Sequence, residues 1–261
     1  MTMTENFDAV SLGRHQQILE TAIKYGVART KTLALAFGVH EMTVRRDMDY
    51  LEQQGLLERV HGGARIVQSA SQEVAYSLRS AQRTLEKQRI ARAALELIQD
   101  GDTIALDSST TALALVRILA VRKVQAIITG LDAANILAAS GVAFTLMGGV
   151  YHSPARSFVG SVFSAGLKRF HPDKVFFSSK GFTPEHGFTD AHLPEVEAKE
   201  LLIQASAQKI ALLDSSKFGS RAVNQILALN AVDTIITEQP PSSTIRTALK
   251  KAGVKLLIAP E

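Results

Sequence analysis

The chain has 261 residues, 46% of them hydrophobic, which is enough for one large domain or two unequal domains with buried cores. Its formal charge is only +4, from 29 basic and 25 acidic residues, so the total charge alone does not indicate an anionic partner. The absence of cysteine excludes disulfides, thiolate nucleophiles and cysteine-based metal sites. None of the seven histidines forms the i, i+4 pair of a helical zinc site, so we expect no metal.

The sequence gives little support to a membrane protein or a nucleotide-dependent enzyme. No apolar run approaches the ~18 residues that span a bilayer, and the first residues lack the apolar core of a signal peptide. We therefore expect a soluble cytoplasmic protein with no membrane partner. Neither a GxGxxG nor a Walker A motif is present, so we expect no cofactor.

The first part of the chain predicts a small helical domain. We expect 1–12 to form a flexible arm, followed by a helix from Arg14 to Tyr25 that stops at Gly26. A second short helical pattern begins after Thr30 and ends at Gly38. A third helix follows almost at once, with its apolar residues spaced to face the first two. Two short helices joined by a tight glycine-containing turn are typical of a helix-turn-helix.

The segment after Gly55 predicts a hairpin. The sequence LLERVHGGARIV contains two β-prone runs around His61-Gly62-Gly63, and glycine allows the positive φ that a hairpin tip needs. Residues 13–67 are therefore predicted to form a winged helix-turn-helix.

The third helix carries the best candidates for contact with double-stranded DNA. A rotation of about 100° per residue places Thr43, Arg45 and Arg46 outward in its first turns. A recognition helix inserts this part into the major groove, where arginine reaches guanine O6 and N7 or clamps phosphate. Paired arginines on a helix are more often a solvated surface, but here they follow a tight turn and precede a glycine wing. That context favours DNA binding.

Residues 68–98 predict a linker and a connecting helix. The segment QSASQE at 68–73 is small and polar, and a helical pattern then runs to Ile98. We interpret the basic residues of this helix as a solvated face between two domains.

Residues 99–261 predict a mostly parallel α/β domain. Short β-branched runs alternate with helical patterns, which implies a parallel sheet covered on both faces. The predicted strands are 103–107, 124–129, 142–147, 174–178, 209–214, 233–238 and 254–259. The predicted helices are 110–120, 132–139, 162–169, 196–207 and 244–251.

Polar turns follow several of these strands, where ligands bind in open α/β sheets. The turn DSSTT at 107–111 leads into a helix amino terminus, so it either holds a phosphate or simply caps the helix. Lys180 and Lys217, at neighbouring strand ends, favour phosphate, and Asp107 could accept sugar hydroxyls. We interpret Gly148-Gly149 as a close backbone turn beside the ligand.

These residues resemble a known family. The run from Arg14 through TVRRD to HGGAR resembles the amino-terminal domain of DeoR-type bacterial transcriptional regulators. The segments LEKQRIARAALELIQDGDTIALDSSTT, MGGV, DKVFF, GFTD, LPEVEAK and LLDSSKFG resemble their sensor domain. The resemblance implies a fold akin to ribose-5-phosphate isomerase and the CoA transferases, a phosphorylated sugar or polyol as effector, and repression of carbohydrate-use genes. It also implies a homo-oligomer, a dimer or tetramer.

The resemblance and the strand-end positions together define two sets of candidate residues. The predicted DNA-binding residues are Arg29, Lys31, His40, Thr43, Arg45, Arg46, Arg59, His61, Gly62, Gly63 and Arg65. The predicted effector-binding residues are Asp107, Ser108, Ser109, Thr110, Thr111, Thr129, Gly148, Gly149, Lys180, Asp190, Glu195 and Lys217.

Three positions depart from the family pattern. His40 replaces a small capping residue, so the third helix either has a cap weaker by about 1 kcal/mol or uses the imidazole to contact DNA. Gly130 stands where asparagine commonly follows the threonine. Lys180 adds a cation, which suggests an effector more acidic than a hexose phosphate, such as a sugar-acid phosphate.

A sugar-phosphate isomerase with an accessory DNA-binding domain is the alternative. Carboxylates and lysines at strand ends could supply general acid–base pairs. The winged helix-turn-helix would then have no role, so the sequence favours a regulator over an enzyme.

Overall fold

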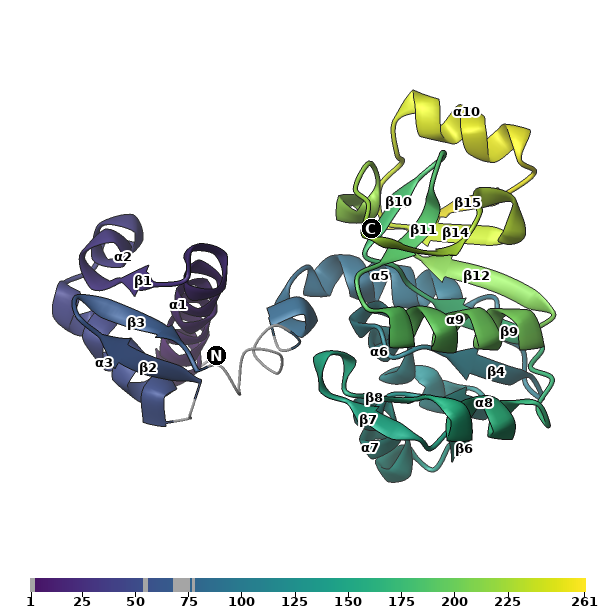
Figure 1. Cartoon of the computed structure of the whole chain (residues 1–261), viewed down its shortest axis with the longest axis horizontal. Coiled ribbons are helices and arrows are strands. Elements are labelled where there is room, and N and C mark those ends of the chain that lie inside the picture. Colours follow the sequence, from purple (N-terminus) through teal and green to yellow (C-terminus); the bar gives the residue numbers. More distant parts are fainter. Residues whose placement is uncertain (1–2, 54–55, 68–75, 77) are drawn as a thin grey trace. The chain divides into compact units, whose positions relative to one another are not determined.

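The computed structural model describes residues 3–53, 56–67, 76 and 78–261, which form two compact units, 1–82 and 83–261 (Figure 1). The predicted polar joint at 68–73 lies outside the described residues. The second unit begins at Arg83, whereas the sequence assigned residues up to 98 to a connecting segment.

The first unit contains the three predicted helices: α1 Met3–Tyr25, α2 Thr30–Phe37 and α3 Glu41–Gln53. Val44, Met48 and Leu51 of α3 are buried together with Ile18 and Leu33, as the apolar spacing predicted. Helix α1 starts at Met3, inside the segment predicted to be a flexible arm. That segment contains neither proline nor glycine, so its backbone does not interrupt the helix.

The predicted wing is a hairpin of β2 Leu57–Val60 and β3 Gly63–Ile66. Gly62, in the turn, has a φ of +74°, which favours glycine. A third strand, β1 Ala28–Arg29, pairs with β3 and was not predicted. A Cβ on Gly63 would lie 2.2 Å from the backbone oxygen of Ala28, so Gly63 lets β1 and β3 approach closely.

The second unit is built on a seven-stranded parallel sheet in the order β15-β14-β12-β9-β4-β5-β6. All seven predicted strands are present in it. Their bounds are β4 Thr103–Leu106, β5 Gln125–Ile128, β6 Ala143–Leu146, β9 Lys174–Phe177, β12 Gln208–Leu212, β14 Thr234–Thr237 and β15 Lys255–Ile258.

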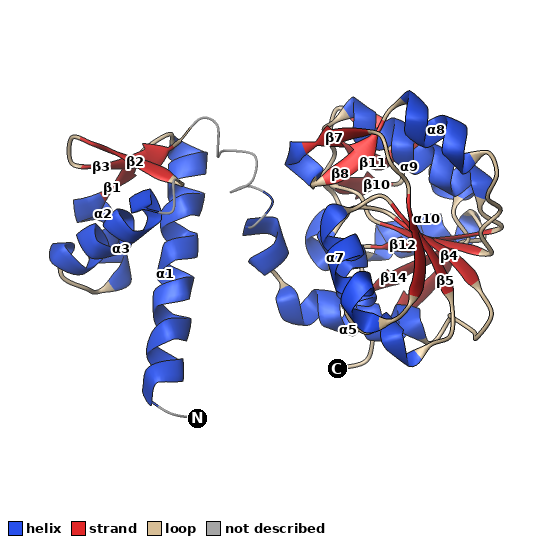
Figure 2. Cartoon of the chain, turned by 90° about the horizontal axis from the view of Figure 1, so that it is seen from below, coloured by secondary structure: helices blue, strands red, loops and turns tan. Residues whose placement is uncertain are grey.

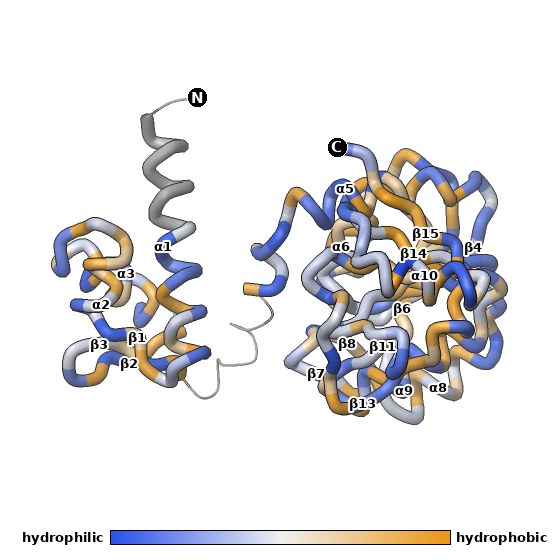
Figure 3. The backbone as a smooth tube through the Cα atoms, turned by 90° about the horizontal axis from the view of Figure 1, so that it is seen from above, coloured by the Kyte–Doolittle hydropathy of each residue, from blue (hydrophilic) through white to orange (hydrophobic). Residues whose placement is uncertain are grey.

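Helices cover both faces of this sheet, as predicted (Figure 2). On one face lie α5 Thr84–Leu95, α6 Thr110–Val116 and α7 Leu131–Ser140. On the other lie α8 Ser161–Leu167, α9 Leu193–Ala205 and α10 Ser243–Lys251. Neighbouring side chains of a strand alternate between the two cores, and both cores are apolar, so the buried residues of the central strands are hydrophobic on both faces of the sheet (Figure 3).

Two small antiparallel sheets accompany the main one. One consists of β10 Gly181–Thr183, β11 Gly187–Asp190 and β13 Asn224–Leu227, and the other of β7 Val150–His152 and β8 Ser157–Val159. None was predicted. Short 3-10 turns complete the unit: η1 Leu119–Val121, η2 Ser153–Ala155, η3 Ser215–Lys217 and η4 Leu229–Ala231.

Helix α5 corrects the interpretation of the connecting segment. It packs on α6 through Ile90, Ala91 and Ala94, which belong to the core of the second unit. Its basic residues are not a uniformly solvated face, because Lys87 is buried and Arg89 binds backbone carbonyls near the carboxyl terminus.

Candidate functional site

The first turns of α3 present an exposed basic surface. Arg45 and Arg46 are exposed and Thr43 is half-buried, which agrees with the predicted rotation of the helix. The Arg45 side chain is 55% exposed and lies 3.6 Å from Glu41, an i, i+4 pair that water screens strongly. Beside them, a hollow between α2 and α3 is lined by Lys31, His40 and Met42, among others. The surface is therefore free to meet an anionic polymer.

His40 precedes the first residue of α3 and caps it. Its Nδ1 accepts the N–H of Met42 at 3.2 Å, and its backbone oxygen accepts the N–H of Thr43 at 2.9 Å. An accepting Nδ1 requires the neutral ring with the proton on Nε2. The imidazole thus takes the place of the small capping residue expected at this position.

The cap leads to a prediction for His40. We expect His40→Ala to destabilise the first unit by about 1 kcal/mol, because one N–H of the helix start loses its partner. His40→Asn should preserve stability, because asparagine is a good cap. Thermal unfolding checks the cap, and unchanged stability of His40→Ala would contradict it. The affinity of His40→Asn for operator DNA tests whether the imidazole also contacts DNA. A loss of affinity in this variant would assign such a contact to it.

Contacts within the first unit fix several predicted DNA-binding residues. Arg59 binds Asp49 and the backbone oxygen of Arg45, which joins the wing to α3. Arg29 donates to the backbone oxygen of His61 at 2.8 Å and so fixes the wing tip.

The remaining candidates differ in what they can contact. Arg65 pairs with Glu58 on the neighbouring strand at 2.6 Å. Lys31 and Arg46 are exposed and have no ion-pair partner in the described part of the chain. Gly63 is buried, and so supports the wing instead of facing a ligand.

Asp47 was not among the candidates, although it follows the paired arginines directly. It is buried and accepts from Arg14 Nε at 2.8 Å, while His15 Nε2 lies 3.1 Å from its other oxygen. This ion pair fixes α3 against α1. The TVRRD motif therefore combines two outward arginines with a buried aspartate, Asp47, that binds α1.

In the second unit, a buried charge cluster lies at the carboxyl ends of the central strands. Lys199 Nζ lies 2.7 Å from Asp190 Oδ2 and 3.5 Å from Asp107 Oδ2, and donates to the backbone oxygen of Ser178 at 3.0 Å. Asp107 also accepts the N–H groups of Ser109 and Ser178. The predicted Asp107 and Asp190 are thus brought together by a lysine that sequence reasoning missed.

Glu195 is the centre of an adjoining network. Its oxygens accept from Ser108 at 2.8 Å and from Ser157, and His152 Nδ1 lies 3.1 Å from Oε1. The ring of His192 packs edge-on against that of His152 at 5.4 Å between centroids. Glu195 is 5% exposed and has several protein partners, so it orients the groups around it.

The two predicted lysines are carried by neighbouring loops. Lys180 Nζ lies 3.7 Å from Asp190, and Lys217 Nζ lies 3.7 Å from Asp214. The Ser220 hydroxyl donates to the backbone oxygen of Lys217 at 3.0 Å and is 3.5 Å from that of Lys180. The side chains of Lys180 and Lys217 are 34% and 28% exposed, so both lysines are partly accessible.

The other predicted effector residues divide into buried and accessible groups. Ser108, Thr111 and Thr129 are buried, whereas Ser109 and Thr110 are half-buried. Ser109 caps α6 by accepting the N–H of Ala112 at 3.1 Å, so the capping interpretation of the DSSTT turn applies at this residue.

The two glycines have different surroundings. A Cβ on Gly149 would lie 2.4 Å from the backbone oxygen of Val159, whereas Gly148 is exposed and borders open space. Both glycines are exposed, but only Gly149 is required for the close approach of the backbone to β8.

Burial and charge shift four pKa values in this cluster. Burial raises the pKa of Asp107, although Lys199 and the Ser109 hydroxyl act against it. Burial also opposes ionisation of Asp190, but Lys199 and Lys180 lower its pKa to about 2. The pKa of Glu195 is lowered, because bonds from His152 and Ser157 and the charge of Lys199 outweigh burial. The surrounding carboxylates raise the pKa of Lys199 despite its burial.

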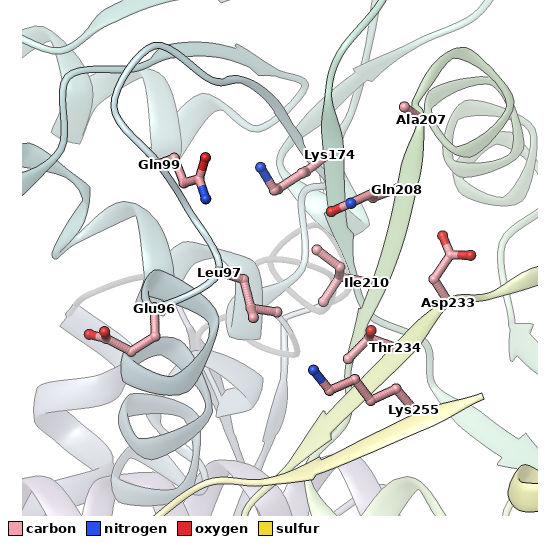
Figure 4. A pocket seen from close by; sticks show the side chains of 10 residues that line it. All are labelled: Glu96, Leu97, Gln99, Lys174, Ala207, Gln208, Ile210, Asp233, Thr234 and Lys255. Atoms are coloured by element: carbon pink, nitrogen blue, oxygen red, sulfur yellow. The ribbon is translucent and has the colours of Figure 1, made fainter. Parts of the chain in front are cut away.

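A separate cavity of about 610 Å³ opens at the amino ends of the strands (Figure 4). It is lined by Lys174, Asp233 and Lys255, among others, and contains none of the predicted effector residues. Within the described residues, no group of histidines and carboxylates is arranged to hold a metal ion. No helix among them is long and apolar enough to cross a membrane.

Comparison with known families decides between the two interpretations of the sequence. Residues 14–70 match the DeoR-like helix-turn-helix domain, and residues 82–239 match the DeoR C terminal sensor domain. The chain belongs to the DeoR family of transcriptional regulators. The sugar-phosphate isomerase alternative is set aside on this assignment, because members of the family are regulators and not enzymes. The outward arginines of α3 are thus part of a DNA-binding domain.

The chain is similar to known transcriptional regulators over nearly its whole length. It is 34% identical over 243 residues to the HTH-type transcriptional repressor GlcR of Bacillus subtilis (strain 168), covering 92% of this chain and 93% of that one. It is 29% identical over 245 residues to the glycerol-3-phosphate regulon repressor of Escherichia coli (strain K12), covering 93% and 97%. Ribose 5-phosphate isomerase A of Methanocaldococcus jannaschii shows 16% identity and a TM-score of 0.39, covering 51% and 53%. That last score indicates a partial likeness only.

Proposed function

We propose that this DeoR-family regulator is a repressor of carbohydrate-use genes, relieved by a phosphorylated sugar, polyol or sugar acid. The observation that supports it most directly is the cluster at the carboxyl ends of the strands. There, hydroxyls of the 108–111 turn and two accessible lysines surround carboxylates that the protein already neutralises. Ammonium groups and hydroxyls can donate hydrogen bonds to a phosphate, and neighbouring polar groups can bind sugar hydroxyls.

The buried carboxylates support the site without contacting the effector. Asp107, Asp190 and Glu195 are each at most 5% exposed and are held by protein donors. We infer that they position Ser108, Ser109 and the strand ends, and that the accessible Thr110, Lys180 and Lys217 meet the ligand. Lys180 shares Asp190 with Lys199, so part of its charge is still available for an acidic sugar.

The test is a titration of full-length protein on DNA from its own upstream region at fixed salt, followed by fluorescence anisotropy. The ligand panel contains ribose 5-phosphate, glucose 6-phosphate, glycerol 3-phosphate and 6-phosphogluconate, with the unphosphorylated compounds as controls. We expect one phosphorylated compound to weaken DNA binding about fivefold or more, the usual lower range of allosteric coupling. DNA binding that no compound alters would contradict the sensor function.

The panel also tests the contribution of Lys180. A preference for 6-phosphogluconate over glucose 6-phosphate, reduced in Lys180→Gln, would support the acidic effector. Equal affinities would remove its basis.

We further propose that the regulator acts as a dimer or tetramer. A helix-turn-helix reads one half-site, and two copies held by one oligomer read half-sites at a fixed spacing. Light scattering of the free protein, and of its operator complex, measures the number of chains. A monomer in both would contradict this proposal.

A further inference from the structure

Arg83, the first residue of the second unit, has a backbone conformation unusual for arginine. Its φ of 52° and ψ of 42° lie in the left-handed region, which disfavours residues with a Cβ. It directly precedes helix α5, so the conformation sets the direction in which the chain enters the unit. A residue keeps such a conformation only where its surroundings hold it.

Two strand ends supply most of the contacts that hold Arg83. Its Nη1 donates to the Ser215 hydroxyl at 3.1 Å and lies 3.5 Å from Glu238 Oε1, while its Nε lies 3.6 Å from Asp214 Oδ1. Asp214 and Glu238 are each 2% exposed. Glu238 also accepts the N–H of Ser215 at 3.0 Å. The guanidinium therefore binds to the turn that follows β12 and to the end of β14.

Asp214 connects Arg83 with the proposed effector site. Its Oδ1 faces Arg83, while its Oδ2 lies 3.7 Å from Nζ of Lys217. The N–H of Ser216 donates to Oδ1 at 3.1 Å and fixes the carboxylate between the two cations. An anion bound to Lys217 would compete with Asp214 for that ammonium group. Asp214 would then interact more strongly with Arg83.

We propose that Arg83 is a positioning residue, through which an anionic effector at Lys217 changes the backbone that joins the two units. The proposal rests on the proposed function. In the structure, Lys217 and Arg83 share Asp214. With the site filled, Asp214 holds Arg83 more firmly in its left-handed conformation. The effector thereby favours one direction of chain entry over another, which is the differential interaction that a ligand needs in order to shift an equilibrium.

The experiment compares Arg83→Gln with Arg89→Gln in the full chain. Arg89 is a matched control, because it lies on α5 and loses the same charge, but its partners in the described part of the chain are the backbone oxygens of residues 238, 259 and 260. The four phosphorylated compounds of the panel are the probes, and the one with the largest effect on the wild type is carried forward. Two quantities are measured: the dissociation constant for this compound, and the ratio of DNA affinities without and with it at saturation.

We expect the wild type and Arg89→Gln to show a ratio of about fivefold or more, and Arg83→Gln a ratio below about twofold, with compound still bound. Arg83→Lys, which keeps a cation near Asp214, should recover part of the ratio and also serves if the glutamine variant does not fold. A purely structural role would lower the melting temperature and leave the ratio unchanged.

The contradicting outcomes are distinct. A wild-type ratio retained in a folded Arg83→Gln, or an equal loss in Arg89→Gln, overturns the role of Arg83 alone. A wild type that responds to no compound overturns the proposed function, and this inference with it.

Discussion

Lys199→Met is expected to destabilise the second unit by about 3–5 kcal/mol, the cost of leaving a buried charge without its partner. Its ammonium group is the cation closest to Asp190 and, among the described residues, the only one within 4 Å of Asp107. Methionine fills a similar volume, so the loss reports charge and not a cavity. Calorimetry of the full chain should show the transition of the second unit lowered by roughly 10 °C.

A matched control and a double variant separate charge from packing. Lys250→Met makes the same change on the exposed part of α10 and should stay within about 0.5 kcal/mol of the wild type. Lys199→Met combined with Asp190→Asn should regain part of the lost stability, because one of the unpaired carboxylates is removed. No recovery in the double variant, or an equal loss in Lys250→Met, would count against the buried ion pair.

The same cluster determines how stability depends on acid. Burial raises the pKa of Asp190, but Lys199 and Lys180 lower it from 3.8 to about 2. A carboxyl with a lowered pKa stabilises the fold above its unfolded pKa, and this contribution is lost as the pH falls from about 4 towards 2. The difference in stability between the wild type and Asp190→Asn should therefore shrink over that interval. A difference independent of pH would contradict the ionised Asp190. The pKa of Lys199 is raised, so the stability that its charge contributes is lost only at alkaline pH, outside this interval.

The main sheet could be predicted from sequence, but the small sheets could not. Each of the five inner strands of the parallel sheet contributes buried apolar residues to both cores, and the edge strands β6 and β15 are short, partly apolar runs, so local hydrophobicity locates them. The strand β11 has four residues, and its pairing with β13 joins residues over thirty positions apart. Its position depends on close backbone contact at Gly187, whose Cβ would lie 2.1 Å from the backbone oxygen of Leu227. Local patterns contain no such information.

The candidate sites show the same division. The outward face of α3 follows from the helical repeat, and the polar strand ends follow from the strand positions. Lys199 was missed because lysine on a helix is usually solvated. The signal that could have found it is its i, i+4 spacing from Glu195 on α9, which places both on one face. The pairing of Arg14 with Asp47 crosses 33 positions, so it required the fold.

Arg45→Ala is expected to relax DNA sequence preference at one position of each half-site by ~1–3 kcal/mol, the usual value of a bidentate arginine–guanine contact. Arg45 lies in the first turns of α3, its side chain is 55% exposed, and its ion pair among the described residues is with Glu41. Its backbone oxygen is also 3.4 Å from Arg59 of the wing, which fixes the direction of this turn. Affinity for single-base variants of the operator, measured at fixed salt, checks the prediction.

Lys31→Ala is the matched control, because Lys31 lies on α2 beside the same hollow. A phosphate contact has no sequence information, so this change should weaken binding to all operator variants alike and reduce the slope of affinity against salt by about one. Arg45→Ala should instead discriminate less between bases at one base pair, because it loses affinity for the correct operator but little affinity for operators with a wrong base there. A uniform loss in both variants would assign Arg45 to the phosphates, and base recognition would then have to come from Arg46 or Thr43 on the same exposed turns.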